Sequence, residues 1–310
     1  MRRGESAHIL AIDIGGSKIR AGIVDPRGRI LAIEREELEG DSTFDAVMAR
    51  VLRILSELEK KPIYREVTRA GATVPGLADP ERGLWIYSPF SGIREAPLQS
   101  ILSESLEMPV AIENDVNACA LAEFCFGVCQ GIENFIWITV SNGIGGGIVL
   151  DGKIYRGCSF NAGEIGHVNV EEGGRLCGCG NRGCLEAYAS GASIAKRYAE
   201  LMKGQKEGIA DIDAKAIGVR ARNGDKIALQ IYHETGRFLG RAISHAVNLL
   251  NPQKVVLGGG VATDLELFLP SLEKTLDEFV FREANRGLCI EQTAFLSNAG
   301  LIGAAVVAMG

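Results

Sequence analysis

The sequence predicts an α/β protein with two domains, and three features of the chain support this prediction. Its 310 residues are enough for two separate cores at about 100–200 residues per domain. Apolar runs typical of strands alternate with stretches whose apolar residues recur at helical spacing. A strand, a glycine turn and two further strands near the N-terminus are matched by the same succession from residue 134 onwards. This repetition indicates an internal duplication.

In the first half, glycine turns divide the apolar runs into strands. Gly15-Gly16 ends the first run, and a turn at residues 25–28 ends the second. The helix that follows has a possible capping box, formed by Ser42 and Asp45. The next helix is expected to be capped by Asn114 or Asp115. The expected elements are strands at 8–14, 19–24, 29–34, 67–74, 84–87 and 109–112, and helices at 44–58 and 118–126.

The second half begins with the repeated unit and continues with longer helices. A glycine turn at 142–147 separates two strands, and a turn at 151–153 leads into a third. Residues 155–186 lack periodicity and are expected to form a long functional or metal-bound loop. The remaining expected elements are strands at 134–141, 148–150, 254–257 and 288–296, and helices at 187–203, 226–250, 265–280 and 299–309.

The composition excludes several classes of function. Lys and Arg number 33 against 39 Asp and Glu, so the net charge of −6 leaves no basic excess to neutralise nucleic-acid phosphates. The first residues are polar and lack the apolar region of a signal peptide. No uncharged apolar stretch reaches the roughly 18 residues of a membrane span. We therefore expect a cytoplasmic protein with no nucleic-acid or membrane partner.

A cluster of cysteines predicts a structural zinc site. Cys177, Cys179 and Cys184 supply three thiolates within eight residues, and His167 lies ten residues upstream. Three sulfurs and one imidazole fill the four positions around zinc and leave none open. The alternative is a redox pair or a set of buried thiols. We expect the other five cysteines to be ordinary small core residues: Cys119, Cys125, Cys129, Cys158 and Cys289.

Three glycine clusters that follow strands are candidate phosphate-binding turns. Without side chains, the backbone N–H groups of such turns can approach phosphate oxygens closely, although most glycine turns are only turns. The motifs of P-loop enzymes and of Rossmann dehydrogenases are absent. Asp13, just before the first cluster, can hold Mg²⁺ through water or simply cap the turn. The clusters are Gly15-Gly16-Ser17-Lys18, Asn142-Gly143 with the residues up to Gly147, and Gly258-Gly259-Gly260.

Carboxylates at two places are candidates for chemistry. Glu113-Asn114-Asp115 lies where a strand meets a helix, and a carboxylate there can accept a proton from a substrate hydroxyl. The alternative is helix capping alone. Glu164 and Glu186 flank the cysteine cluster. Zinc would fix the orientation of both flanks and could position a binding site without entering the chemistry.

These residues resemble the ROK family of repressors and sugar kinases along nearly the whole chain. The most specific matches are Asn161-Ala-Gly-Glu-Ile-Gly-His167 and Cys177-Gly-Cys-Gly-Asn-Arg-Gly-Cys-Leu-Glu186. The resemblance implies the duplicated hexokinase/actin-like (ribonuclease H-like) fold, with ATP and sugar in a cleft between the domains. It also implies a smaller domain at 1–116 that includes a C-terminal helix at about 297–310. The larger domain at 117–296 would carry the zinc loop.

By the same resemblance the protein is an ATP-dependent hexose kinase, with glucose as the commonest family substrate. Asp115 would be the base that takes the proton of a sugar hydroxyl, and His167 would be shared between sugar and zinc. Asp13 and the first two glycine turns would hold the phosphates and Mg²⁺, and Gly258–Gly260 would lie beside the adenosine. The resemblance also suggests a dimer or tetramer. The residues expected to hold sugar hydroxyls are Asn114, Glu164, His167 and Glu186.

Three positions depart from the pattern of the family's kinases. Phe90 stands where a Pro-Asn pair usually supplies Asn, and Ile93 replaces a Trp. Asn142-Gly143 stands where Thr-Gly is usual, and Asn can still donate a hydrogen bond. The sequence therefore leaves open whether the acceptor is glucose, N-acetylmannosamine, N-acetylglucosamine, allose or fructose. It also leaves open whether polyphosphate can replace ATP.

Three other classes of protein remain to be weighed. A sugar-sensing repressor would need a DNA-binding module, and only 12 residues precede Asp13. A non-catalytic sugar-binding protein would not need Asp13 and Asp115. An actin-type or chaperone-type ATPase is disfavoured by the zinc cluster. The kinase therefore remains the leading hypothesis.

Overall fold

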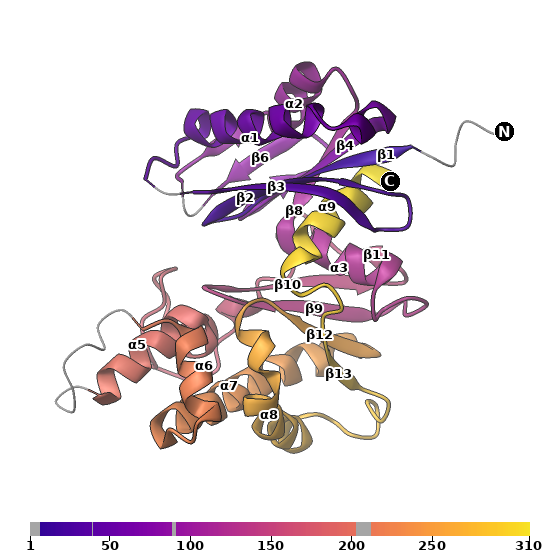
Figure 1. Cartoon of the computed structure of the whole chain (residues 1–310). Coiled ribbons are helices and arrows are strands. Elements are labelled where there is room, and N and C mark those ends of the chain that lie inside the picture. The colour runs from indigo at the N-terminus through magenta and orange to yellow at the C-terminus, as the bar shows by residue number, and fades with distance from the viewer. Residues whose placement is uncertain (1–6, 39, 89–90, 203–211) are drawn as a thin grey trace. The chain divides into compact units, whose positions relative to one another are not determined.

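A computed structural model describes residues 7–38, 40–88, 91–202 and 212–310 (Figure 1). Contacts divide the chain into two compact units. The first contains the residues up to Glu133, Gly147–Ala162 and Ser297–Gly310, and the second contains Asn134–Gly146 and Gly163–Leu296. The first unit thus extends beyond residue 116, where we expected the domain boundary. It does so because the helix that begins at Asp115 packs against the C-terminal helix.

The first unit is built on a five-stranded sheet with the order β3-β2-β1-β4-β8 (Figure 1). Neighbours β1, β2 and β3 pair antiparallel, whereas β4 pairs parallel with both β1 and β8. The apolar runs form these strands almost at the expected bounds. The strands are β1 (His8–Ile14), β2 (Lys18–Val24), β3 (Ile30–Glu37), β4 (Val67–Val74) and β8 (Val110–Asn114).

Both faces of this sheet are buried at its central strand β1. On β1, Leu10 and Ile12 join a core with α1 (Phe44–Glu59), while Ile9 and Ala11 join a second core with α9 (Ala299–Met309). Such alternation follows from the two-residue period of a strand. The backbone of α9 approaches β4 closely enough that a Cβ atom on Gly71 would overlap the carbonyl of Ala304. Glycine at position 71 of β4 therefore lets the C-terminal helix lie directly against the sheet.

Several short elements of the first unit were not expected from the sequence. Among them are the two strands that pair with the strand of Trp85, a residue that is 1% exposed and donates its indole N–H to the carbonyl oxygen of Pro75 at 3.0 Å. Ile93 is also buried in this core, whereas Pro89 and Phe90 lie outside the described residues. The elements are β5 (Leu77–Asp79), β7 (Arg94–Ala96), α2 (Leu98–Leu106) and the 3-10 helix at Pro62–Glu66, beside the expected β6 (Leu84–Tyr87).

A second five-stranded sheet has the order β11-β10-β9-β12-β13, which repeats the order of the first. The expected duplication is therefore confirmed. One prediction within it was wrong: Gly145–Gly147 belong to β10, so the glycine turn is limited to residues 141–143. Residues of β10 after Gly146, together with β11, belong to the first unit. The strands are β9 (Phe135–Val140), β10 (Ile144–Leu150), β11 (Lys153–Ile154), β12 (Lys254–Gly258) and β13 (Cys289–Gln292).

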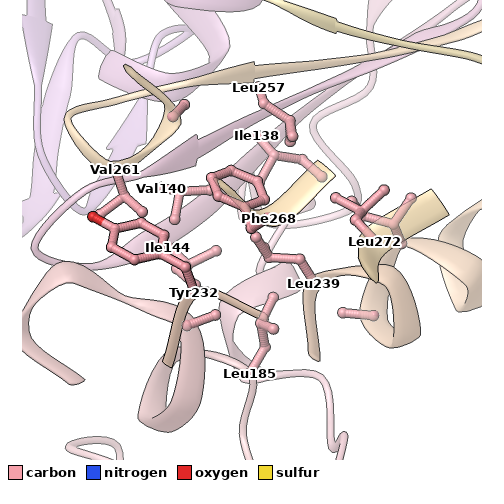
Figure 2. Close-up of a cluster of buried hydrophobic side chains, with 14 of the residues drawn as sticks. Ile138, Val140, Ile144, Leu185, Tyr232, Leu239, Leu257, Val261, Phe268 and Leu272 are labelled. Atoms are coloured by element: carbon pink, nitrogen blue, oxygen red, sulfur yellow. The ribbon is translucent and has the colours of Figure 1, made fainter. Parts of the chain in front are cut away.

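Helices cover the sheet of the second unit and enclose its core (Figure 2). Phe268 and Tyr232 are fully buried there among aliphatic side chains such as Ile138 and Leu257. The helix expected at 187–203 is divided at Ser190, and α6 was not expected at all. No helix in the described ranges is long and apolar enough to cross a membrane. The helices are α4 (Glu186–Ala189), α5 (Gly191–Met202), α6 (Ala214–Arg222), α7 (Lys226–Leu250) and α8 (Leu265–Phe279).

Candidate active site and metal centre

Asp115 stands at the first residue of α3 (Asp115–Phe126), directly after β8. Asn114, rather than Asp115, caps this helix: its Oδ1 accepts hydrogen bonds from the N–H groups of Val116 and Asn117 at 2.9 and 3.0 Å. The Asn114 amide donates to the carbonyl oxygen of Gly76 at 2.8 Å and to Asp115 Oδ1 at 3.1 Å. The hydrogen bonds that Asn114 and Val116 donate to the Asp115 carboxylate both go to Oδ1 and not to Oδ2. This oxygen is therefore available to a ligand.

The environment of Asp115 makes its carboxylate a stronger base than an ordinary aspartate. Burial, followed by the negative charge of Asp13, raises its pKa from 3.8 to about 7. The side chain keeps partial solvent access, but protein atoms surround it densely. A base with a pKa near neutral combines an adequate ionised fraction with a real affinity for the proton. A raised pKa is compatible with the role of base that remains a prediction for Asp115.

Asp13 lies at the end of β1 and is 7% exposed. Its Oδ1 accepts from the Thr73 hydroxyl at 3.0 Å, and its Oδ2 accepts from Arg20 Nε at 3.0 Å. The Arg20 Nη2 group also forms an ion pair with Oδ2. Sequence analysis did not identify Arg20. The signal was available, because Arg20 is paired directly with Asp13 across the hairpin of β1 and β2.

The first and third glycine clusters form turns at strand ends. Gly15 donates its N–H to the carbonyl oxygen of Lys18 at 2.9 Å, while Gly16 and Ser17 are exposed. At the third cluster, Gly258 ends β12 and Gly259 has a φ of 89°, which favours glycine. Gly260 is exposed. Both turns present backbone at the surface, as a phosphate-binding turn requires.

The second turn is tied to Glu186. Glu186 Oε2 accepts the N–H of Ile144 at 2.9 Å, and a Cβ atom on Gly143 would lie 2.8 Å from the same oxygen. Glycine at 143 is therefore needed for this approach. Asn142 is exposed. The structure thus brings two of the predicted site residues of the second unit, Gly143 and Glu186, into direct contact.

Glu113 is another buried carboxylate of the first unit. Sequence analysis named this residue but did not identify the hydrogen-bond network around it. Glu113 is 2% exposed, and its Oε2 accepts from Nε and Nη2 of Arg156 at 2.9 and 2.6 Å. Its Oε1 accepts from the Asn117 amide at 3.1 Å and from the N–H of Asn114 at 3.0 Å. This network supports the strand end that precedes Asp115.

Arg156→Ala is expected to destabilise the protein, because it leaves the Glu113 carboxylate buried without its partner. The loss should be about 3 kcal/mol, the lower end for a broken buried pair, since the Arg156 side chain is 34% exposed. Urea unfolding measures it. Arg53→Ala is the control, because Arg53 pairs with Glu36 at the surface and should cost less than about 1 kcal/mol. Equal losses in the two variants would contradict this role of Arg156.

The predicted metal ligands converge in the second unit. The donor atoms of His167, Cys177, Cys179 and Cys184 all lie within 4.8 Å of one another. Cys177 Sγ is 3.8 Å from His167 Nδ1, and Cys179 Sγ is 3.7 Å from Cys184 Sγ. A tetrahedral zinc site with Zn–S bonds of about 2.3 Å gives sulfur separations of about 3.8 Å. The four side chains therefore have the spacing of a zinc site.

The backbone of the loop explains this convergence. Cys177 donates its N–H to the carbonyl oxygen of Asn181 at 2.8 Å, and Gly180 donates back to Cys177 at 3.0 Å. Gly180 and Gly183 have φ values of 93° and 83°, which let the chain reverse within a few residues. Backbone hydrogen bonding from Asn181 lowers the pKa of Cys179, whereas burial raises that of Cys184 to about 12. A bound cation would offset the cost of ionising the buried thiol.

The predicted sugar ligands of the second unit lie on both sides of this cluster. His167 turns Nδ1 towards Cys177, and its Nε2 is 3.8 Å from Glu164 Oε2. Glu186 begins α4 two residues after Cys184. The metal ligands and these carboxylates are therefore neighbours in one short segment.

A pocket of about 490 Å³ adjoins the cluster. Its wall includes Asn142 of the second glycine turn and Cys177 of the cluster. Arg175 and Lys196 contribute positive charge, and Glu186 and Glu200 contribute acceptors for hydroxyl groups. A ligand with both anionic and hydroxyl groups suits such a wall.

The expectation for the remaining cysteines was only partly correct. Cys119 and Cys129 are buried, and Cys125 is half-buried. Cys158 and Cys289 are exposed, so they are not core residues. Both lie in short or irregular segments, where apolar neighbours in the sequence do not ensure burial.

Comparisons with known proteins find relatives along nearly the whole chain. The ROK family model matches residues 9–310. The glucokinase of Streptomyces coelicolor is 33% identical over 311 residues, which cover 96% of each chain. The DNA-binding transcriptional dual regulator NagC of Escherichia coli is 32% identical over 276 residues, which cover 87% of this chain and 68% of NagC.

A solved structure of a ROK family protein has the same fold as this chain. A ROK family glucokinase from Streptomyces griseus, crystallised with glucose and AMPPNP, superposes with a TM-score of 0.87 and 30% identity. The alignment covers 98% of this chain and 99% of that one. The predicted duplicated hexokinase/actin-like fold is therefore confirmed. With a family model that matches almost every residue, this chain belongs to the ROK family.

Proposed function

We propose that this chain is an ATP-dependent hexose kinase that transfers the γ-phosphoryl group of ATP to a hydroxyl of glucose. Its relatives of nearly equal length are glucokinases, and the solved relative from Streptomyces griseus binds glucose and an ATP analogue. The observation that carries the proposal is Asp115, a carboxylate with one free oxygen and a pKa raised to about 7. A kinase needs such a base at the acceptor hydroxyl.

Positioning accounts for most of the catalysis in this proposal. Asn114 fixes the carboxylate of Asp115 through its amide, so that Oδ2 can receive the proton of the attacking hydroxyl. Glu164, His167 and Glu186 hold the other hydroxyls of the sugar. The expected hydroxyl contact of Asn114 is not kept in this proposal, because its side-chain amide already makes four hydrogen bonds within the protein. Backbone N–H groups of Gly15, Gly16, Ser17 and Lys18, and of Asn142 and Gly143, hold the phosphates. Gly258, Gly259 and Gly260 lie beside the adenosine.

The residues present suit Mg²⁺ and Zn²⁺. Asp13 offers a hard carboxylate oxygen beside the first turn, and Mg²⁺ prefers such ligands and keeps several waters. When bound with ATP, Mg²⁺ neutralises phosphate charge. His167, Cys177, Cys179 and Cys184 form a complete donor set for a structural Zn²⁺ ion, which would hold Glu164 and Glu186 in place.

The pocket beside the cluster supports nucleotide binding. Asn142 belongs to the turn proposed for the phosphates, and Arg175 and Lys196 supply positive charge near it. Glu200 can accept a hydrogen bond from a ribose hydroxyl, whereas Glu186 is reserved for the acceptor sugar. The dimer or tetramer suggested by the family resemblance is also part of the proposal, and light scattering after gel filtration tests it.

A non-catalytic sugar-sensing protein is the second candidate, because NagC is a relative. The Asp115 environment disfavours it. A sugar-binding protein has no need to bury two carboxylates that repel each other, and that arrangement costs stability. In a kinase the same arrangement has a use, because the raised pKa lets Asp115 accept the proton of the sugar hydroxyl.

The experiment is coupled ADP release with Mg-ATP over a panel of sugars. The panel contains glucose, mannose, fructose, allose, N-acetylglucosamine and N-acetylmannosamine. We expect rapid turnover of glucose. Turnover of another hexose alone would correct the substrate, and binding of sugar with no turnover of any member would favour the sugar-sensing candidate. The same assay with polyphosphate in place of ATP, followed by detection of the sugar phosphate, tests which phosphoryl donor the protein uses.

The pH profile should have an acidic limb caused by Asp115. A general base must be ionised, so activity should fall as pH drops below its pKa, which is about 7. The rate should be nearly constant above that pH and should fall about tenfold for each unit well below it. The measurement is kcat/KM for the sugar between pH 5 and 9. A profile that stays flat down to pH 5 would exclude a base with this pKa.

A further inference from the structure

Arg20 and Asp13 form a nearly buried ion pair beside the candidate base. Their side chains are 12% and 9% exposed. Arg20 uses Nε and Nη2 on Asp13 Oδ2, and Nη1 donates to the carbonyl oxygen of Ser297. The guanidinium group is therefore held from two sides. The Arg20 side chain is therefore held in one orientation by more contacts than a typical surface ion pair has.

The contacts of Asp13 leave little room for a metal ion. A carboxylate offers about four lone-pair directions. Two donors from Arg20 and the hydroxyl of Thr73 occupy three of them. A Cβ atom on Gly300 would lie 2.7 Å from Asp13 Oδ1, so the start of α9 closes another side. What remains can accept one further hydrogen bond, such as that of a water molecule.

We propose that Arg20 is a positioning residue that restricts Asp13 to holding Mg²⁺ through water. By occupying Oδ2, it prevents the free protein from binding a divalent cation directly at Asp13. Asp13 would therefore act only on a metal–nucleotide complex, by accepting a hydrogen bond from a water molecule of that complex. This inference deepens the proposed function, because it assumes that the Asp13 turn receives a metal–nucleotide complex.

The charges of Asp13, Asp115 and Arg20 also support a role of Arg20 in preventing direct metal binding. Asp13 and Asp115 bring two carboxylates together, and Asp13 is close enough to raise the pKa of Asp115. Paired carboxylates without a counter-ion attract free divalent cations. Arg20 supplies the counter-ion from the protein itself. The planar guanidinium group places two donors on Asp13 Oδ2 and so holds the positive charge in a fixed position. The single ammonium group of Lys cannot reproduce this geometry.

The test measures metal binding without nucleotide or sugar. Mn²⁺ serves as the probe for Mg²⁺, on protein whose Cys/His cluster has first been filled with Zn²⁺, by calorimetry. Wild type should show no saturable Mn²⁺ site in the millimolar range. Arg20→Ala should gain one saturable site whose affinity for Mn²⁺ is at least about tenfold higher than the weakest affinity that this titration detects, and the double variant Arg20→Ala/Asp13→Asn should lose it. Arg35→Ala is the matched control, because Arg35 faces Arg20 across β2 and β3 but is exposed.

Two outcomes would overturn the inference. One is Mn²⁺ binding by Arg20→Ala that equals wild type, and the other is a gain that persists after Asp13→Asn. If Arg20→Ala does not fold, Arg20→Lys decides, since a single ammonium frees part of Oδ2 and should give a smaller gain; no gain there also overturns it. Sugar turnover does not enter these measurements. Failure of the kinase proposal is therefore distinguishable from failure of this one.

Discussion

Asp115→Asn is expected to lower kcat by about 10³-fold and, at neutral pH, to make the protein more stable. The loss follows from the contribution of a general base, typically 10²–10⁴-fold. The gain follows because the Asn Oδ1 can keep the hydrogen bonds from Asn114 and Val116 while the buried charge beside Asp13 disappears. Activity and stability should thus change in opposite directions.

The stability gain should depend on pH. The folded pKa of Asp115, about 7, lies above its ordinary value of 3.8, so ionisation of this group destabilises the folded protein. The penalty is absent below about pH 4, grows between the two values and is complete above about pH 7. We expect a gain of about 1–3 kcal/mol at pH 8, reduced from the full linkage value because Asp115 is partly exposed.

Urea unfolding at pH 4.5 and pH 8, together with steady-state kinetics, measures both effects. Asp45→Asn is the matched control, because Asp45 is an exposed carboxylate in the first turn of α1. It should leave kcat unchanged and should not stabilise the protein. If Asp115→Asn were equally stable relative to wild type at both pH values, the account of its raised pKa would be wrong.

Loss of one ligand of the Cys/His cluster is expected to have the second large effect. Cys184 is 1% exposed and belongs to the core as well as to the donor set. A structural zinc ion contributes its binding free energy to folding, so Cys184→Ser should cost on the order of 5 kcal/mol. The remaining folded fraction should bind sugar poorly, because Glu186 lies two residues away and holds the second glycine turn.

Elemental analysis, chelator titration and thermal unfolding measure this effect. Purified wild type should contain about one zinc per chain, and a strong chelator should lower its melting temperature towards that of Cys184→Ser. Cys289→Ser is the control, since this exposed cysteine lies outside the cluster. Fully folded wild type that contains no metal, or a Cys184→Ser variant as stable as Cys289→Ser, would contradict the zinc proposal.

Hydrophobic periodicity was sufficient for most of the fold. Strands β1 and β4 and helix α7 occur at the expected bounds, because long apolar runs and a strong 3.6-residue period leave few alternatives. Short elements were missed. Strands β5 and β7 have three residues each, and a pattern that short has no readable period. Their pairing depends on tertiary contacts around Trp85.

The site was predictable where its chemistry is local in sequence. The cysteine spacing led directly to a cluster with the distances of a zinc site, and the strand-to-helix junction led to Asp115. Partners distant in sequence were not predictable in the same way. Arg156 meets Glu113 across 43 residues, and only the folded chain brings them together. Arg20 is the intermediate case, because a hairpin register would have predicted its position opposite Asp13.

The most direct test of the kinase proposal is identification of the product formed from Mg-ATP and glucose. Phosphorus NMR of the reaction mixture distinguishes a sugar phosphate from inorganic phosphate, and the position of the phosphoryl group follows from its coupling to the sugar protons. We predict glucose 6-phosphate and ADP in equal amounts with wild type, and almost none with Asp115→Asn. ADP with inorganic phosphate alone, or equal sugar phosphorylation by the folded Asp115→Asn variant, would contradict a sugar kinase that uses Asp115 as its base.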